Sequence, residues 1–172
     1  MTKVYPLALI GAYSLLAGCV NQTTVSQQQL KPVSSPCNKI DLLIQSSHQN
    51  FESMKTAQVK AKSTQTWKAK YNLVGDNCQI FTLGKNELTY SCRVDAVDKE
   101  QAITLYDNAK TITAKCLGDS WNALEEDRVN DNGKKTLFTH NDEKTNISAH
   151  LVPSKVAFKE QWTVYYYIGG SK

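Results

Sequence analysis

The segment CQIFTLGKNELTYSC, residues 78–92, predicts a β-hairpin with its own disulfide. Two short runs of alternating apolar and polar residues flank the turn sequence GKNE at 84–87, which is typical of two antiparallel strands joined by a short loop. If the turn is centred on Lys85, Cys78 lies directly opposite Cys92, and Cβ atoms of opposed residues are about 4.5–5.5 Å apart. That separation favours a cross-strand disulfide, although a register shift of one residue would separate the thiols.

The segments on either side of this hairpin predict two helices. Apolar residues at helical spacing between Asn38 and about Ala61 predict the first helix, with Asn38 as a candidate N-cap. Asp98 followed by Gln101 forms a capping box that predicts the start of the second helix, and Gly118 is expected to end it. The apolar positions are Ile40, Leu43, Ile44, Phe51 and Met54 in the first helix, and Ala102, Leu105, Tyr106, Ala109, Ile112 and Cys116 in the second.

The rest of the chain reads mainly as strands. Alternating patterns predict strands at 66–73, 135–140, 146–152 and 162–168, and Pro153 is expected to end the third of these. The predicted order is α-β-β-β-α-β-β-β, with 121–129 as an ambiguous further strand. We therefore predict an α+β domain in which two helices lie on one face of an antiparallel sheet. The two halves share an α-β-β-β pattern, without a residue-level repeat that supports a duplication.

The N-terminus predicts export. Lys3 is followed by an apolar run at 4–16 and by small residues, as in a signal peptide, and this run is too short to span a membrane. The tetrapeptide Leu16-Ala17-Gly18-Cys19 resembles the lipobox of bacterial lipoproteins, and the resemblance covers about the first twenty residues. It implies cleavage before Cys19 and a diacylglycerol on its sulfur. A secreted protein with a chance cysteine, or an uncleaved anchor, is the alternative.

The resemblance also implies a domain organisation and a location. Residues 1–18 would be the lipoprotein signal peptide, 19–36 a lipidated cysteine with a flexible tether rich in Gln, Ser and Thr, and 37–172 a single periplasmic domain. Val20 rather than Asp follows Cys19, which by the family's sorting rule favours the periplasmic face of the outer membrane. The membrane is then one partner through the lipid, and the sequence indicates no cofactor and no metal.

Four cysteines remain after Cys19. An even number in an exported chain favours two disulfides over free thiols, and the C-x-x-C or nearby His spacing of a metal site is absent from the sequence. If the two helices pack antiparallel on one sheet, the start of the first meets the end of the second. We therefore predict a Cys37–Cys116 bridge beside the Cys78–Cys92 bridge.

The charge of the chain does not favour nucleic acid as a partner. Lys and Arg number 20 and Asp and Glu 16; without residues 1–18, which carry only Lys3, 19 minus 16 leaves +3. The lysines are scattered along the chain, whereas nucleic-acid binding needs basic residues gathered on one face.

The sequence contains no G-x-S-x-G nucleophile motif, no H-E-x-x-H metal motif and no glycine-rich phosphate-binding loop. His48, His140 and His150 are candidates for acid-base chemistry, but each has a plain explanation as an exposed or half-exposed residue. In the acidic run 125–127, Glu125 and Asp127 would share one face of a strand. A weak envelope hydrolase, one alternative function, would need a pocket that joins one of these carboxylates to His140 or His150.

The last predicted strand indicates a binding surface instead. Its alternation puts Tyr166 on one face and Tyr165 and Tyr167 on the other. If the helices cover the first face, the tyrosine pair lies on the uncovered face of the sheet. Tyrosines in such positions serve recognition or ordinary packing. We therefore expect a non-catalytic binding module with a protein partner in the envelope, as an accessory component of an envelope or secretion assembly. The alternative is an immunity or inhibitor lipoprotein directed against a toxin or a cell-wall hydrolase.

Overall fold

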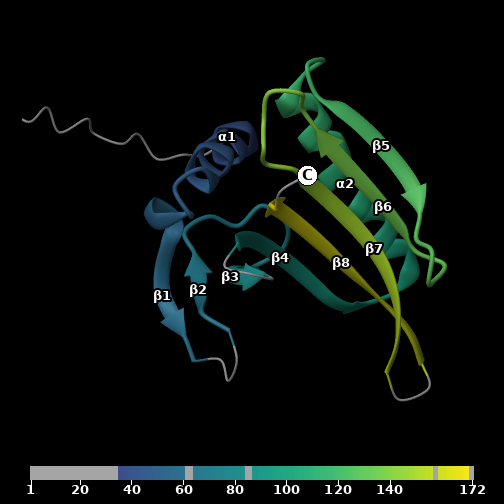
Figure 1. Cartoon of the computed structure of the whole chain (residues 1–172). Helices are drawn as coiled ribbons and strands as arrows, with labels where there is room; N and C mark the ends of the chain where they lie inside the picture. The colour runs from purple at the N-terminus through teal and green to yellow at the C-terminus, as the bar shows by residue number, and fades with distance from the viewer. Residues whose placement is uncertain (1–34, 61–63, 84–86, 157–158, 171–172) are drawn as a thin grey trace, which may run out of the picture. The chain divides into compact units, whose positions relative to one another are not determined.

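The computed structural model describes residues 35–60, 64–83, 87–156 and 159–170, which form an open sheet with helices on one face (Figure 1). The strands within these ranges all pair antiparallel, in the order β1-β2-β3-β4-β8-β7-β6-β5. The elements are α1 (Pro36–Ser47), a 3-10 turn (Glu52–Met54), β1 (Lys55–Val59), β2 (Thr66–Ala69), β3 (Asn77–Leu83), β4 (Glu87–Val97), α2 (Lys99–Leu117), β5 (Asn122–Asp127), β6 (Lys134–Thr139), β7 (Ile147–Val156) and β8 (Lys159–Gly169). The predicted α+β class, with helices on one face, is confirmed.

Each half of this domain is a helix followed by four strands that pair in sequence (Figure 1). The halves meet where β4 pairs with β8, so the last strand of each half lies at the centre of the sheet and the first strands, β1 and β5, form its edges. The order is thus α-β-β-β-β twice, one strand more in the first half than predicted. The ambiguous segment 121–129 supplies β5 in the second half.

The predicted hairpin register is confirmed. Cys78 lies opposite Cys92 and Ile80 opposite Tyr90, and the two cysteines form a disulfide with their Cα atoms 4.0 Å apart. The second predicted bridge, Cys37–Cys116, joins the start of α1 to the end of α2 with a Cα–Cα distance of 4.8 Å. The turn residues 84–86 lie outside the described residues.

The first helix is shorter than predicted at its C-terminal end. It ends at Ser47, well before Ala61, because Asn50 and Phe51 adopt left-handed φ angles of 53° and 55° that turn the chain out of the helix. The N–H of Phe51 donates to the carbonyl of Ser46 at 2.8 Å and secures this turn. Phe51 is still fully buried, so its apolar spacing reports the core rather than a continued helix.

The N-cap of α1 also differs from the expectation. Ser35, not Asn38, is the cap: its hydroxyl accepts a hydrogen bond from the Asn38 N–H at 3.5 Å. Pro36 occupies the first position of the helix, where its missing N–H has no intrahelical partner to lose.

The second helix has the predicted ends but a slightly different buried face. The carboxylate of Asp98 accepts from the Gln101 N–H at 2.8 Å, and Gly118 ends the helix with a φ of 69°. Ile112, predicted to be buried, is 43% exposed. Thr113 is buried in its place, because its hydroxyl is satisfied by the Tyr166 hydroxyl at 2.8 Å and donates to the Ala109 carbonyl at 2.7 Å.

Pro153 does not end its strand, contrary to the prediction. β7 continues to Val156, and Pro153 pairs with Trp162 of β8. The pairing of β6 with β7 stops at Leu151, so beyond that residue β8 is the only described strand that pairs with β7. Proline is tolerated on such an edge because the missing N–H removes no bond of a central ladder.

The core fills the space between the helices and the sheet. Its largest fully buried side chains include three tyrosines, Tyr90, Tyr106 and Tyr166. The Tyr90 hydroxyl donates to the Tyr71 carbonyl at 3.0 Å, so this polar group is satisfied in the core. Among the described residues, neither helix has the length and apolar character needed to cross a bilayer.

Candidate binding face of the sheet

The face of the sheet that α1 and α2 leave uncovered is called the open face. On β8, Val164 and Tyr166 are buried against the helices, while Tyr165 and Tyr167 are half-buried on the open face. The two tyrosine rings are stacked, with centroids 5.9 Å apart and planes 8° from parallel. The tyrosine pair expected from the sequence therefore stands on the face where it was expected, on the strand at the centre of the sheet.

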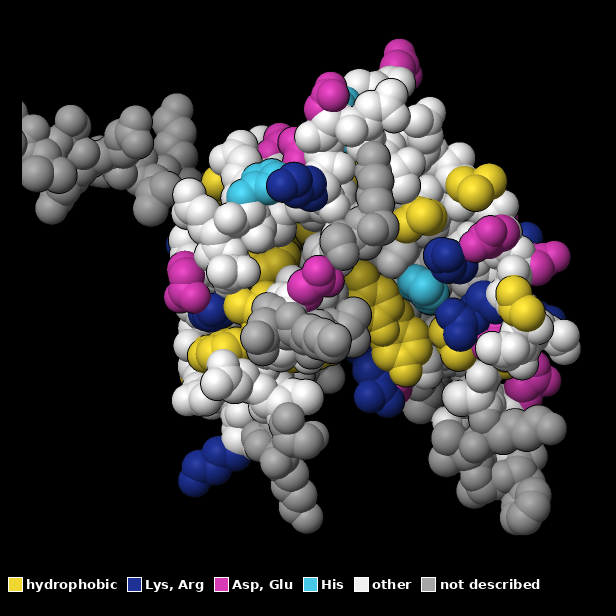
Figure 2. All heavy atoms as spheres, viewed as in Figure 1, with side chains coloured by type: hydrophobic (Ala, Val, Ile, Leu, Met, Phe, Trp, Pro, Cys, Tyr) yellow, Lys and Arg dark blue, Asp and Glu magenta, His cyan; other side chains and the backbone are white. Residues whose placement is uncertain are grey.

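Basic and aromatic side chains border this tyrosine stack. Sheet register places His150 and Arg93 directly beside Tyr165, one on each neighbouring strand. The Arg93 guanidinium lies 5.7 Å from the Tyr165 ring centroid, and the His150 ring meets the Tyr167 ring edge-on at 5.4 Å. Figure 2 shows hydrophobic side chains near the middle of the face, next to His, Lys and Arg side chains.

The cations of this face are matched by acids. Arg93 pairs with Asp95, and the Lys135 ammonium lies 2.9 Å from a Glu126 carboxylate oxygen. Arg128, from the loop after β5, lies 3.0 Å from Asp131 and also donates to His150 Nδ1 at 3.0 Å. The face around the tyrosine stack therefore carries ordered charges but no large excess of one sign.

His150 is neutral in this setting. Burial, followed by the nearby charges of Arg128 and Lys135, lowers the pKa of His150 from 6.5 to about 4. Its Nδ1 accepts from Arg128, so Nε2 carries the proton and donates to the Ser148 hydroxyl at 3.0 Å. Burial likewise raises the pKa of the Tyr167 hydroxyl, so at neutral pH both groups present uncharged hydrogen-bonding atoms.

We expect His150 to make the protein sensitive to acid. Because the pKa of His150 is lower in the folded than in the unfolded chain, the unfolded chain binds this proton first, and the free energy of unfolding falls as the pH drops from about 6.5 to about 4. His150→Gln should show a shallower fall over that window, measured by urea unfolding at several pH values. Equal slopes in the two proteins would contradict the prediction, since the carboxylates titrate in both.

The open face is hollowed beside the tyrosine stack. A hollow of about 240 Å³ is lined by Phe81, Ser91, Tyr165 and Tyr167 together with three polar residues of β3 and β4. Those three, Asn77, Gln79 and Arg93, also line a larger hollow of about 630 Å³ that reaches the loop between β2 and β3. The two hollows therefore adjoin.

Two of the candidate catalytic groups, Glu125 and His150, are not brought together. Glu125 faces the helices, where its carboxylate contacts the Lys110 ammonium and the Tyr106 hydroxyl. His150 lies on the open face, on the other side of the sheet from Glu125 and its cross-strand partner Thr136. His150 and Glu125, one of the histidine–carboxylate pairs that a hydrolase pocket could use, thus stand on opposite faces of the sheet.

The other two histidines lie elsewhere. His140 lies against Trp121 with ring centroids 5.5 Å apart, in the segment after β6. His48 Nε2 is 3.1 Å from a Glu143 carboxylate oxygen, just beyond the end of α1. Neither residue lines the hollows beside the tyrosine stack.

Several residues of the open face were missed by the sequence reading. Once Cys78 and Cys92 are placed on the helix side, alternation puts Gln79, Ser91 and Arg93 on the open face. That signal was present in the sequence. The contact of Arg93 with Tyr165 could not be predicted in this way. It depends on the pairing of β4 with β8, and no pattern of neighbouring residues indicates which distant strands pair.

The four cysteines that the structure describes are all in disulfides, and the described ranges hold no group of three His, Cys, Asp or Glu side chains placed to bind a metal. Cys19 lies outside the described residues. Comparisons with models of known protein families, with curated proteins and with solved structures give no match.

Proposed function

We propose that this protein is a bacterial lipoprotein, anchored through Cys19 to the periplasmic face of the outer membrane, whose domain is a non-catalytic binding module. The lipobox resemblance supports the anchor. The stacked pair Tyr165 and Tyr167 on the open face is the observation that carries the binding role. In this proposal the domain serves as an accessory component of an envelope or secretion assembly and docks a protein partner on the open face.

The tyrosine stack suits a protein interface for two reasons. Tyrosine and arginine are enriched in the parts of interfaces that contribute most to affinity, and Arg93 lies against Tyr165. Both tyrosines also stand on β8, which is paired on both sides, by β4 and by β7. Their backbone is therefore already ordered before binding, so docking costs little further conformational entropy.

Apolar surface extends outward from the stack toward the β5 edge. Leu137 of β6 lies opposite Ser148, which in turn lies opposite Tyr167, and Leu124 of β5 lies opposite Leu137. Leu124 is 60% exposed. One row of the open face thus runs from the tyrosine stack to an exposed leucine at the edge of the sheet, the kind of surface that a protein partner covers.

The test of this role is a cross-linked pull-down of the lipidated protein from its own envelope. The variant with both Tyr165→Ser and Tyr167→Ser is expected to lose the captured partner. Ile103→Ser, which removes a half-exposed apolar side chain from α2, is the matched control and should retain the partner. A partner captured equally by all three proteins would place docking elsewhere, and a stoichiometric toxin or cell-wall hydrolase would favour the immunity alternative.

The membrane anchor has its own test. Cys19→Ser is expected to leave the domain folded but to move the protein from the membrane fraction to the soluble fraction, because buried lipid chains contribute about 0.8 kcal/mol per CH₂ to membrane binding. Fractionation with immunoblotting measures the shift, and Cys37–Cys116 and Cys78–Cys92 disulfide formation checks the fold. A Cys19→Ser protein that stays with the membrane would contradict the lipoprotein proposal.

A further inference from the structure

We propose that the two adjoining hollows of the open face form a site for a neutral oligosaccharide. We call the two hollows together the polar groove. The residues that line it lie on β2, the β2–β3 loop, β3, β4 and β8. It runs from the aromatic wall of Phe81, Tyr165 and Tyr167 across β3 and β4 to the β2–β3 loop. Its two parts measure about 240 and about 630 Å³, room for more than one sugar ring.

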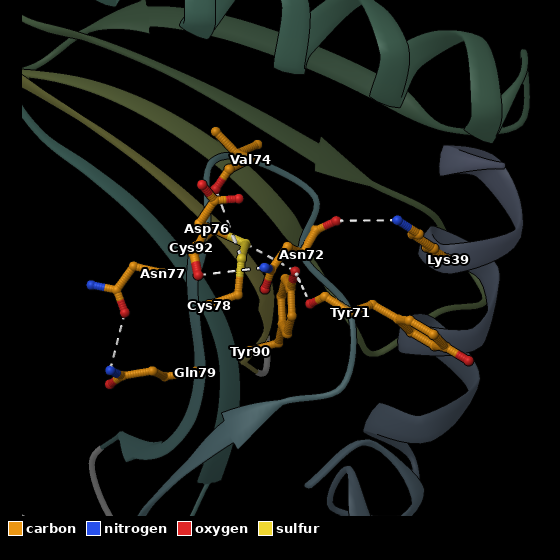
Figure 3. The surroundings of a disulfide bond; sticks show 10 residues. All are labelled: Lys39, Tyr71, Asn72, Val74, Asp76, Asn77, Cys78, Gln79, Tyr90 and Cys92. Atoms are coloured by element: carbon orange, nitrogen blue, oxygen red, sulfur yellow. Dashed lines mark hydrogen bonds between the residues drawn. A yellow bond between two sulfur atoms is a disulfide. The ribbon is translucent and has the colours of Figure 1, made fainter. Parts of the chain in front are cut away.

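Planar amide groups line the groove. The amide nitrogen of Gln79 donates to the amide oxygen of Asn77 at 3.2 Å, and Figure 3 shows both side chains pointing away from the nearby disulfide. This bond leaves the amide nitrogen of Asn77 as a donor and the amide oxygen of Gln79 as an acceptor. Asn72 adds a third amide from the β2–β3 loop. Neighbouring donors and acceptors of this kind match the hydroxyl and acetamido groups of a sugar.

The charges in the groove favour an uncharged ligand. Two cations, Lys68 and Arg93, and two carboxylates, Asp76 and Asp95, line the larger hollow. Arg93 and Asp95 pair with each other, so the groove carries no excess charge that would attract a phosphate or a metal ion. Charged groups that are already paired still accept or donate hydrogen bonds to hydroxyls.

The aromatic wall supplies the apolar part of the site. Phe81, Tyr165 and Tyr167 line the smaller hollow, and an aromatic ring with a polar hydroxyl suits a ligand that has both C–H faces and hydroxyl groups. Sugar rings have this character. Amides at one end and aromatic rings at the other therefore match the two kinds of surface on an oligosaccharide.

An extended peptide fits the groove less well. β3 pairs with β2 and β4, and β4 pairs with β3 and β8, so the floor has no unpaired strand edge to which a peptide strand could add. The larger hollow is lined mostly by polar side chains, whereas peptide anchors are apolar side chains that fill apolar pockets.

The groove is preformed. The Cys78–Cys92 disulfide joins its two floor strands (Figure 3), and Gly75 in the loop wall has a φ of 63°. A Cβ on Gly75 would lie 2.5 Å from Val94 Cγ2, so glycine allows the loop to lie directly against β4. A ligand therefore meets a wall that is already in place.

The inference is tested by calorimetric titration of the purified lipidated protein, in detergent, with chitohexaose and with cellohexaose. We expect at least one of these neutral sugars to bind the wild type. The combined variant Asn77→Ala and Gln79→Ala, which removes two hydrogen-bonding side chains, should bind it about tenfold more weakly. Asn122→Ala, an exposed amide on β5, is the matched control and should bind as the wild type does.

Two results would overturn the inference: a wild type that binds neither sugar, and an amide variant that is folded by its thermal transition yet binds as tightly as the wild type. The inference goes beyond the proposed protein partner and fails separately from it. The amide variant is expected to keep the partner captured in the pull-down, while the tyrosine double variant should lose both the partner and the sugar.

Discussion

Replacing Cys37 and Cys116 together with alanine is expected to lower the free energy of unfolding by about 4.5 kcal/mol. Their disulfide joins residues 79 positions apart, so its loss frees a long loop in the unfolded chain, and the conformational entropy gained there favours unfolding. Both side chains are only half-buried, so alanine leaves little cavity to add to this effect. Urea unfolding under oxidising conditions measures the change.

The second disulfide is the internal comparison. Cys78 and Cys92 are 14 positions apart and buried, so this bond is opened by a reductant in the Cys37→Ala and Cys116→Ala variant, which keeps both thiols in the core, and the same entropic argument predicts a loss of about 3 kcal/mol. Wild-type protein unfolded in the presence of a reductant should show about the sum of the two losses. A larger loss for the Cys78 and Cys92 pair than for the Cys37 and Cys116 pair would contradict loop length as the dominant factor.

Tyr166→Ala should lower the free energy of unfolding by about 3 to 5 kcal/mol, the range for deleting a large aromatic side chain from a packed core. Tyr166 is 1% exposed at the centre of the sheet, and its hydroxyl bonds to Thr113 of α2. Removing the ring leaves a cavity between sheet and helix and also leaves the Thr113 hydroxyl with one partner fewer.

The neighbouring tyrosine provides a matched control for this variant. Tyr165→Ala removes the same atoms one residue earlier, on the open face, where the ring is only half-buried, and should cost about 1 kcal/mol. Thermal and urea unfolding of the two variants, side by side, measure the difference. Equal losses would mean that β8 does not present alternate side chains to the helices in the observed register.

Local patterns were sufficient to predict the hairpin and the second helix. The register that pairs Cys78 with Cys92 follows from the turn and from the alternation of the two strands that flank it. The Asp98 cap follows from the spacing of Asp98 and Gln101, three residues apart. The predicted first helix is too long because Phe51 and Met54 keep the apolar spacing of a helix, although the chain leaves the helical path before Phe51 and turns there. A left-handed phenylalanine leaves no mark in the sequence, since glycine or asparagine usually takes that conformation.

The edge of the sheet was harder to predict. All six residues of β5 are exposed, so its sequence shows none of the alternation that marks a strand with one buried face. The tyrosines of the open face were predicted because β8 alternates from Val164 to Ile168, between buried and half-buried side chains. The groove was not predicted from the sequence. It depends on the pairing of β4 with β8, which are distant in sequence, and on the close approach of the β2–β3 loop to β4, which Gly75 allows.

The position of β8 has a consequence for how the chain acquires its structure. Among the described elements β8 comes last along the chain, yet it lies between β4 and β7, in the middle of the sheet. Until β8 pairs with them, β4 and β7 each present unpaired backbone N–H and C=O groups that can pair with a second chain. No backbone hydrogen bonds of the sheet then join its two halves. The two halves of the sheet therefore join only through β8, and a chain cut before β8 would expose an edge on β4 and an edge on β7 rather than fold into a smaller domain.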